Sequence, residues 1–218
     1  MPPKKPTTTK AAAKPAGKTL TPGGAKSKGG AKGAGLAGGT KAKSAAEPPK
    51  GPPLPEVTMG AKQIMPLLTK DTEEILKKSQ RWPYIVDPNG LIPRLLQYSD
   101  VNLLEVMVSE HMEPERIRMA LLGSLRYGKP VVFDMGELDM FSAINEFMDR
   151  IHPDLTNMVL TKKVIEEEYI EKLIKSTDDP DYKNAMFYQK DGFSLAFVTS
   201  KEEVSDDMKS KMLVVRVE

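Results

Sequence analysis

The stretch Arg81-Trp82-Pro83-Tyr84-Ile85-Val86-Asp87-Pro88-Asn89-Gly90 decides the class of fold. Its apolar run, from Trp82 to Val86, is rich in aromatic and β-branched residues and is typical of a short buried strand, while Pro88-Asn89-Gly90 is typical of a turn. Helical spacing resumes over residues 91–98, where Pro93 predicts that the helix starts at that residue or later. A buried strand that leads through a turn into a helix is the unit from which parallel sheets are built.

The rest of the chain alternates strand and helix patterns in the same way. Asp71 or Thr72 is the expected N-cap of the first helix, and Pro114 is the expected first residue of the third. We expect further strands at residues 103–108, 129–134, 193–199 and 212–217, further helices at residues 70–79, 113–128, 138–151 and 162–175, and a loop at residues 176–183. This alternation predicts an α/β domain with a mainly parallel sheet of about five strands, joined by right-handed crossovers.

The composition changes before residue 61. Residues 1–50 contain eleven Lys and one Glu, a net charge of +10, whereas residues 51–218 contain 21 basic and 29 acidic residues, a net charge of −8. Eleven of the sixteen Gly and ten of the eighteen Pro precede residue 61, and no aromatic residue precedes Trp82. Such a segment has too little apolar surface to offset its ordering entropy. We therefore expect a disordered, basic Lys/Ala/Pro/Gly tail over residues 1–60 and one folded domain over residues 61–218.

Composition also excludes several classes of site. The chain has no Cys, which excludes disulfides, thiolate zinc sites and cysteine nucleophiles, and its two His are too few for most metal sites. No apolar run approaches the roughly 18 residues needed to span a bilayer, and the chain start carries no apolar run typical of a secretory signal. We expect a cytoplasmic protein without membrane contact, metal or cofactor.

The candidate ligand site lies where the expected strands end, because open α/β sheets bind ligands beyond the carboxyl ends of their strands. Residues 87–94 stand where a phosphate-binding loop would lie, but they contain one Gly and no Lys, and Pro93 lacks an amide donor. Asp134 and Glu137, at the end of the third strand, resemble the carboxylates that hold magnesium and polarise water, although they are three positions apart. An acid in such a position is more often a turn former or a helix cap, and we favour that interpretation. We expect no catalytic residue. If a nucleotide binds, the expected contacts are Asp87, Asn89, Gly90, Arg94, Asp134, Glu137 and Thr199.

Several segments, in the same order along the chain, resemble the fifth AAA module of dynein heavy chains. Residues 81–90 resemble the R-W-P-h-h-I-D-P-x-G segment that opens that module. Residues 128–134 and Gly136-Glu137-Leu138-Asp139 resemble its G-x-P-V-L-L-E-x-x-G-E-x-L-D, residues 193–201 resemble its strand ending in I-T-T-K, and residues 204–217 resemble the strand that follows. The resemblance covers residues 79–218, and a similar segment occurs in a ciliary protein with IQ and ankyrin motifs.

This resemblance implies an AAA-like large subdomain of the P-loop NTPase type, preceded by the basic tail. The fifth dynein module itself lacks a working phosphate loop, so the resemblance implies a degenerate unit that does not hydrolyse nucleotide. The motif after the third strand is one residue shorter here, and the chain stops at Glu218, where a helical lid would begin, so we expect no lid. The implied function is a non-catalytic binding or scaffold module, located at the cytoskeleton and associated with microtubules or the axoneme of a cilium.

The tail suggests a second interaction. Lys residues without Arg or aromatic side chains suit diffuse electrostatic contact with a polyanion such as an acidic tubulin tail, because base stacking and bidentate phosphate contacts need the missing residues. Two alternatives remain for the chain: a weak ATP-binding or ATPase domain using Asp134 and Glu137, and sequence-independent nucleic-acid binding through the tail. A third reading is that the tail only solubilises the protein. The candidate polyanion contacts are Lys4, Lys5, Lys10, Lys14, Lys18, Lys26, Lys28, Lys32, Lys41 and Lys43.

Overall fold

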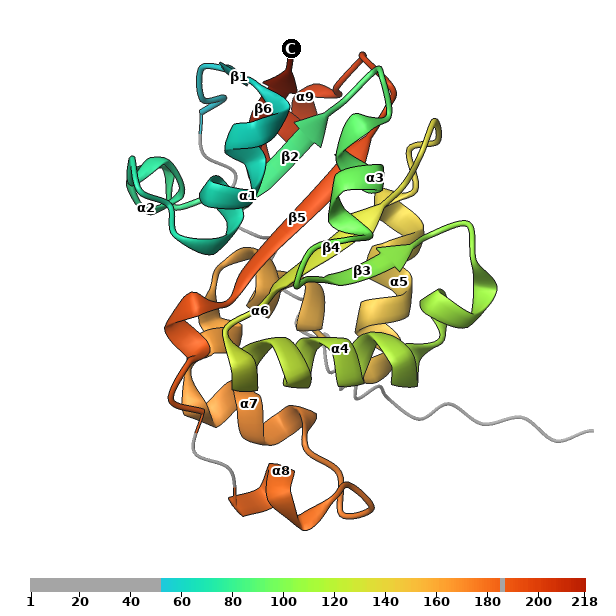
Figure 1. Ribbon diagram of the computed structural model, residues 1–218. Coiled ribbons are helices and arrows are strands. Elements are labelled where there is room, and N and C mark those ends of the chain that lie inside the picture. The colour runs from blue at the N-terminus through green and yellow to red at the C-terminus, as the bar shows by residue number, and fades with distance from the viewer. Residues whose placement is uncertain (1–51, 185–186) are drawn as a thin grey trace, which may run out of the picture. The chain divides into compact units, whose positions relative to one another are not determined.

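Six parallel strands form the core of the computed structural model, which describes residues 52–184 and 187–218 (Figure 1). Every pair of neighbouring strands is parallel, and the order across the sheet is β1-β6-β2-β5-β4-β3. The strands are β1 (Val57–Met59), β2 (Pro83–Val86), β3 (Asn102–Glu105), β4 (Pro130–Asp134), β5 (Ser194–Thr199) and β6 (Leu213–Val217).

Helices and short 3-10 turns connect the strands. The helices are α1 (Ala61–Thr69), α2 (Ile75–Ser79), α3 (Leu91–Leu96), α4 (Pro114–Tyr127), α5 (Phe141–Ile151), α6 (Leu155–Leu160), α7 (Glu167–Leu173), α8 (Pro180–Asn184) and α9 (Asp206–Lys211). The 3-10 turns are η1 (Ser109–Met112), η2 (Lys163–Ile165) and η3 (Lys190–Gly192). Among the described residues, no helix combines the length and the apolar character needed to cross a membrane.

The sheet separates two apolar layers. Alternate side chains of a strand point to opposite faces, so Tyr84 and Val86 join one core and Ile85 joins the other. The larger core packs α4, α5, α6 and α7 against the sheet, and the smaller one packs α1, α2 and α3 against the opposite face (Figure 1). In the larger core the rings of Phe133 and Phe197 stack at 5.4 Å between centroids.

The structure confirms the α/β class with a parallel sheet, and all five expected strands are present. The sixth strand, β1, lies before the expected domain start at residue 61, inside the stretch assigned to the tail. Its three residues pair with β6, and only Met59 is buried, so the segment has no periodicity that a sequence pattern could reveal. The folded unit therefore begins earlier than expected.

Several expected helices have different bounds. The expected helix at residues 70–79 is the short α2, preceded by α1, which was not expected. Asp71 is not the N-cap, which is Glu74, but its carboxylate accepts the amide protons of Leu76 and Lys77 at 3.1 and 2.8 Å. Helix α3 begins before Pro93, because an amide in the first turn has no acceptor within the helix and its loss costs nothing there.

The region between β4 and β5 also differs from expectation. The helix expected at residues 162–175 is divided into η2 and α7, with Glu166 in an extended conformation between them. Helix α6 was not expected, and α8 lies in the expected loop. In contrast, α4 has the expected Pro114 at its start and ends at Gly128, whose φ of +64° suits glycine.

Candidate functional site

The loops that follow β2, β4 and β5 meet at the carboxyl edge of the sheet. The Asp87 amide donates to the carbonyl of Thr199 at 2.8 Å, and the Met135 amide donates to the carbonyl of Val198 at 2.9 Å. The Thr199 hydroxyl donates to the carbonyl of Gly136 at 2.9 Å. Asp87, Asp134 and Thr199 are therefore brought together, as their positions at the ends of neighbouring strands predict.

The turn between β2 and α3 is closed by its own aspartate. The Gly90 amide donates to the Asp87 carbonyl at 3.2 Å, and Gly90 has a φ of +61°, which lets the chain turn directly into α3. Oδ2 of Asp87 accepts the Ile92 amide at 2.6 Å, and this side chain is only 1% exposed. A protein carboxylate thus binds the amide of the helix start, where a phosphate-binding loop would present its donors to the ligand.

Negative charge gathers beside this turn. Burial raises the pKa of Asp134, the amide of Gly136 opposes that shift, and the charges of Glu105 and Asp87 raise the pKa further. Among the described residues, Oδ1 of Asp87 is buried without a hydrogen-bond partner. These neighbouring carboxylates repel a phosphate group unless a cation lies between them.

Thr199 is used by the protein itself. Its hydroxyl donates to Gly136 and accepts the amide of Lys201 at 3.1 Å, and the residue is buried. The one proton that this hydroxyl could donate to a γ-phosphate is therefore already used in joining the loops after β4 and β5.

The other residues expected at a nucleotide site lie on the surface. Asn89 and Glu137 are exposed, and Arg94 is exposed in the last turn of α3. Within the described ranges, Arg94 forms no hydrogen bond or ion pair. The structure therefore places three of the seven expected contacts in one cluster and holds Gly90 in the adjoining turn, while the remaining three are on the outside.

Comparison with protein-family models and solved structures does not assign the chain to a family. No family model matches the chain. No solved structure matches it either. Within the described residues, no group of three or more His, Asp and Glu side chains is arranged to hold a metal ion. The ring of His111 instead accepts the amide of Glu105 at 3.1 Å through Nδ1.

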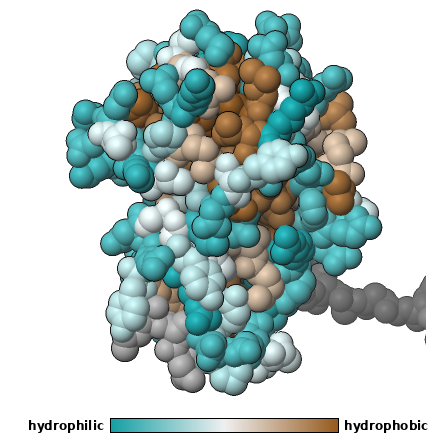
Figure 2. Space-filling model, in the orientation of Figure 1, coloured by the Kyte–Doolittle hydropathy of each residue, from teal (hydrophilic) through white to brown (hydrophobic). Residues whose placement is uncertain are grey.

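An exposed apolar surface borders the same edge. Leu91, Leu95 and Tyr98 project from α3 and the residues just after it, and Tyr98 is 91% exposed. Met107 follows β3 and Leu138 follows β4, and both are at least half exposed. Figure 2 shows the brown apolar atoms over α3 and toward the loops after β3 and β4. We call these five residues the α3 surface.

Sequence reasoning missed the α3 surface although a signal exists. The helix carries apolar residues on two sides, because Ile92 and Leu96 are buried whereas Leu91 and Leu95 are exposed. The spacing of Leu91, Leu95 and Tyr98 by four and three residues is that of a helical stripe, and the buried pair accounts for packing on the sheet. The buried stripe packs α3 on the sheet, and the exposed stripe has no packing role within the domain.

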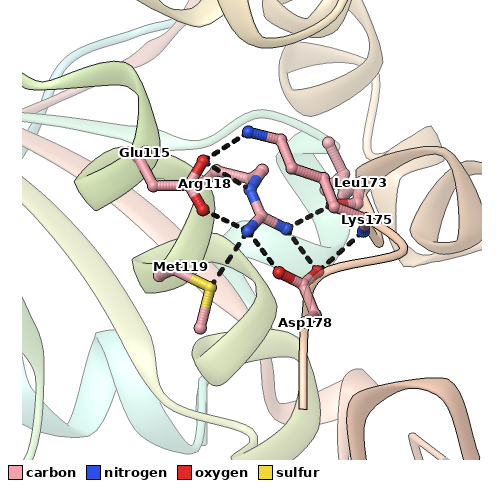
Figure 3. A network of polar contacts seen from close by, with 6 residues as sticks. All are labelled: Glu115, Arg118, Met119, Leu173, Lys175 and Asp178. Atoms are coloured by element: carbon pink, nitrogen blue, oxygen red, sulfur yellow. Dashed lines mark hydrogen bonds and ion pairs between the residues drawn. The ribbon is translucent and has the colours of Figure 1, made fainter. Parts of the chain in front are cut away.

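A second polar cluster surrounds Arg118 on α4 (Figure 3). The guanidinium donates to Asp178 at 2.6 and 2.7 Å, to the Leu173 carbonyl at 2.7 Å and to Glu115. Lys175 adds a contact of 2.5 Å from its Nζ to Glu115 and one of 2.7 Å from its amide to Asp178. The cluster therefore joins α4 to the segment that follows α7.

The charges of this cluster neutralise one another. Hydrogen bonds from Arg118 lower the pKa of Asp178 to about 2, and hydrogen bonds from Arg118 and Lys175 lower that of Glu115 to about 2. The same contacts raise the pKa of Arg118. Because the guanidinium is 1% exposed and already holds two carboxylates, it offers no free donor to a ligand. We interpret this cluster as a brace for the chain between α7 and α8.

Proposed function

We propose that the chain is a non-catalytic, AAA-like binding module, related to the motor region of dynein heavy chains and associated with microtubules or an axoneme. One observation carries the proposal: the carboxylate of Asp87 binds the Ile92 amide at 2.6 Å, where a nucleotide phosphate would have to lie. The hydroxyl of Thr199 supports it, because its proton is already donated to the Gly136 carbonyl and is not offered to a phosphate.

The strand order supports the relationship to the AAA fold. Strand β5 lies between β2 and β4, so the segments that resemble the dynein module at residues 81–90, 128–139 and 193–201 end at adjacent places on one edge. A fold that brought these segments to separate places would not support the resemblance. The AAA identity itself is part of the proposal.

The first test measures whether the chain binds magnesium-ATP. Calorimetry of the full chain with magnesium-ATP is expected to give no heat of binding at micromolar concentrations. Micromolar binding that the substitution Asp134→Asn abolishes would instead support the ATP-binding or ATPase alternative and overturn the proposal.

The α3 surface is the protein-binding face in this proposal. Apolar side chains that cluster on a surface and border polar residues mark interaction sites. Binding of the full chain to isolated axonemes tests the face: Leu95→Ser should lower the bound fraction several-fold. Gln97→Ser, at the exposed C-cap of the same helix, is the matched control and should leave binding unchanged. Equal losses in both variants would refute a role for this face.

Contact with microtubules is assigned to the tail. The candidate lysines all lie outside the described residues. Their charge is positive, whereas residues 51–218 carry a net charge of −8. Since an acidic body is repelled by an acidic tubulin surface, the full chain should cosediment with microtubules at low salt and less so at moderate salt. A variant lacking residues 1–51 keeps β1 and should stay in the supernatant. Equal pelleting of both proteins would discard the tail contact.

A further inference from the structure

A pocket of about 400 Å³ opens at the amino edge of the sheet, opposite the Asp87 turn. Its walls come from the end of α1, from α2, from η2 and from the segment that leads into β5. Trp82, Phe193 and Leu76 form an apolar floor, each at most 5% exposed, and the Trp82 and Phe193 rings pack edge to face at 5.7 Å. In Figure 2 the surface narrows at the left of the view, below the lobe that contains α2. The volume lies in the range of small-molecule sites.

The ammonium group of Lys162 stands in this pocket. Its Nζ donates to the Leu76 carbonyl at 3.2 Å and lies 4.5 Å from the centre of the Trp82 ring. Burial lowers the pKa of Lys162, and the charge of Asp71 opposes that shift. Lys162 forms no ion pair with any residue that the structure describes. A half-buried cation without a carboxylate partner is costly, and an anion that binds it recovers part of that cost.

The other charged groups of the pocket leave this position open to an anion. The Asp71 carboxylate already accepts two backbone amides, and Glu74 pairs with Lys77 at 3.3 Å and with Lys78 at 4.0 Å. Asp191 is the remaining acid of the lining and is exposed on η3. Asp71 is the acid of this lining whose charge acts on Lys162, and among the described residues no carboxylate lies within ion-pair distance of the ammonium.

The backbone around the pocket is strained. Four of the non-glycine residues with positive φ line it: Asp71 at 40°, Glu74 at 55°, Gln80 at 57° and Lys162 at 62°. A non-glycine residue keeps a positive φ only where its surroundings impose that conformation, and such residues gather at ligand sites. The strain at Lys162 fixes the point from which its side chain reaches over the indole of Trp82.

We propose that this pocket binds a small organic carboxylate, with the carboxylate on the Lys162 ammonium and an apolar body against Trp82 and Ile165. A carboxylate fits better than a phosphate, because the lining contains no Arg to provide the paired donors that a doubly charged phosphate prefers. The lining combines an apolar floor with one half-buried cation, Lys162, whereas its other two lysines, Lys70 and Lys77, are exposed to solvent. A single cation over an apolar floor suits a monoanion with a short hydrocarbon chain. This inference does not depend on the proposed scaffold function, since the pocket lies at the opposite edge of the sheet.

Trp82 provides the assay, because it is the only tryptophan of the chain. Titration of the full chain with sodium hexanoate should change the Trp82 fluorescence along a saturable curve as the ammonium turns toward the carboxylate. Hexan-1-ol, which has the apolar body alone, and inorganic phosphate, which has the charge alone, should bind at least tenfold more weakly. The absence of a saturable change with hexanoate, or equal affinity for hexan-1-ol, would overturn the proposal.

Two variants test whether Lys162 binds the carboxylate. Lys162→Met keeps the apolar length and should weaken hexanoate at least tenfold, whereas Lys163→Met removes a neighbouring exposed cation outside the pocket and should change nothing. Equal affinity of Lys162→Met and the wild type would refute the role of Lys162. If Lys162→Met does not fold, the wild-type pH profile decides. Affinity should fall as the pH rises through a midpoint below 10.5, the ordinary pKa of lysine, and a flat profile up to that pH would contradict the proposal.

Discussion

Substitution of Asp178 should destabilise the fold far more than substitution of a surface aspartate nearby. Its carboxylate accepts two bonds from Arg118, at 2.6 and 2.7 Å, and one from the Lys175 amide at 2.7 Å. Removing one partner of a buried ion pair costs about 3–5 kcal/mol, because the remaining charge stays buried without compensation. Arg118 would keep Glu115 and the Leu173 carbonyl, so we expect Asp178→Ala to cost about 3 kcal/mol, at the lower end of that range.

The matched control is Asp181→Ala. Asp181 pairs with Arg126 at 3.8 Å, but its side chain is 78% exposed, and an exposed pair contributes less than about 1 kcal/mol. Urea unfolding of both variants, followed by circular dichroism at pH 7, gives the two free energies of unfolding. A loss in Asp178→Ala within about 0.5 kcal/mol of that in Asp181→Ala would refute the interpretation of the Arg118 cluster as a structural brace.

Three further predictions concern the same fold. The pKa values of Asp178 and Glu115 are lowered to about 2, so the stability that these carboxylates contribute is present above their ordinary pKa values of 3.8 and 4.5 and is lost as the pH falls toward 2. Urea unfolding between pH 5 and pH 2 should show this loss of stability. The Asp178→Ala variant should show a smaller loss over the same pH range. Gly128→Ala should cost about 1–3 kcal/mol, because φ is +64° and the new Cβ would lie 2.7 Å from the Gln189 carbonyl oxygen. Gly123→Ala, inside α4 with open space around it, should instead stabilise by about 0.5–1 kcal/mol, and thermal unfolding that ranks the two alike would contradict the argument. Asp87→Ala should cost about 1–2 kcal/mol in urea unfolding through loss of the bond to the Ile92 amide, and an unchanged midpoint would show that this bond does not hold the turn.

The candidate site was predictable in part. The positions of Asp87, Asp134 and Thr199 at the ends of strands place them at one edge, and the single Gly and Pro93 already indicate a poor phosphate loop. The hydrogen bond from the Ile92 amide to Asp87 was not predictable, because it depends on the rotamer of one side chain in a closed turn. The pocket around Lys162 was missed for a similar reason, since its walls come from segments more than eighty residues apart.

The sequence by itself determined the parallel α/β class and the five longer strands. The apolar runs of β2, β4, β5 and β6 are covered on both faces, and a run of that kind is visible without knowledge of its neighbours. It also determined the ends of α4, because Pro114 and Gly128 act through local backbone geometry. Only the tertiary structure decided the pairing of β1 with β6, the division of residues 162–175 into two elements and the contacts of Arg118. These features rest on hydrogen bonds and packing between distant segments, whose free energy exceeds the weak local preferences of the residues involved.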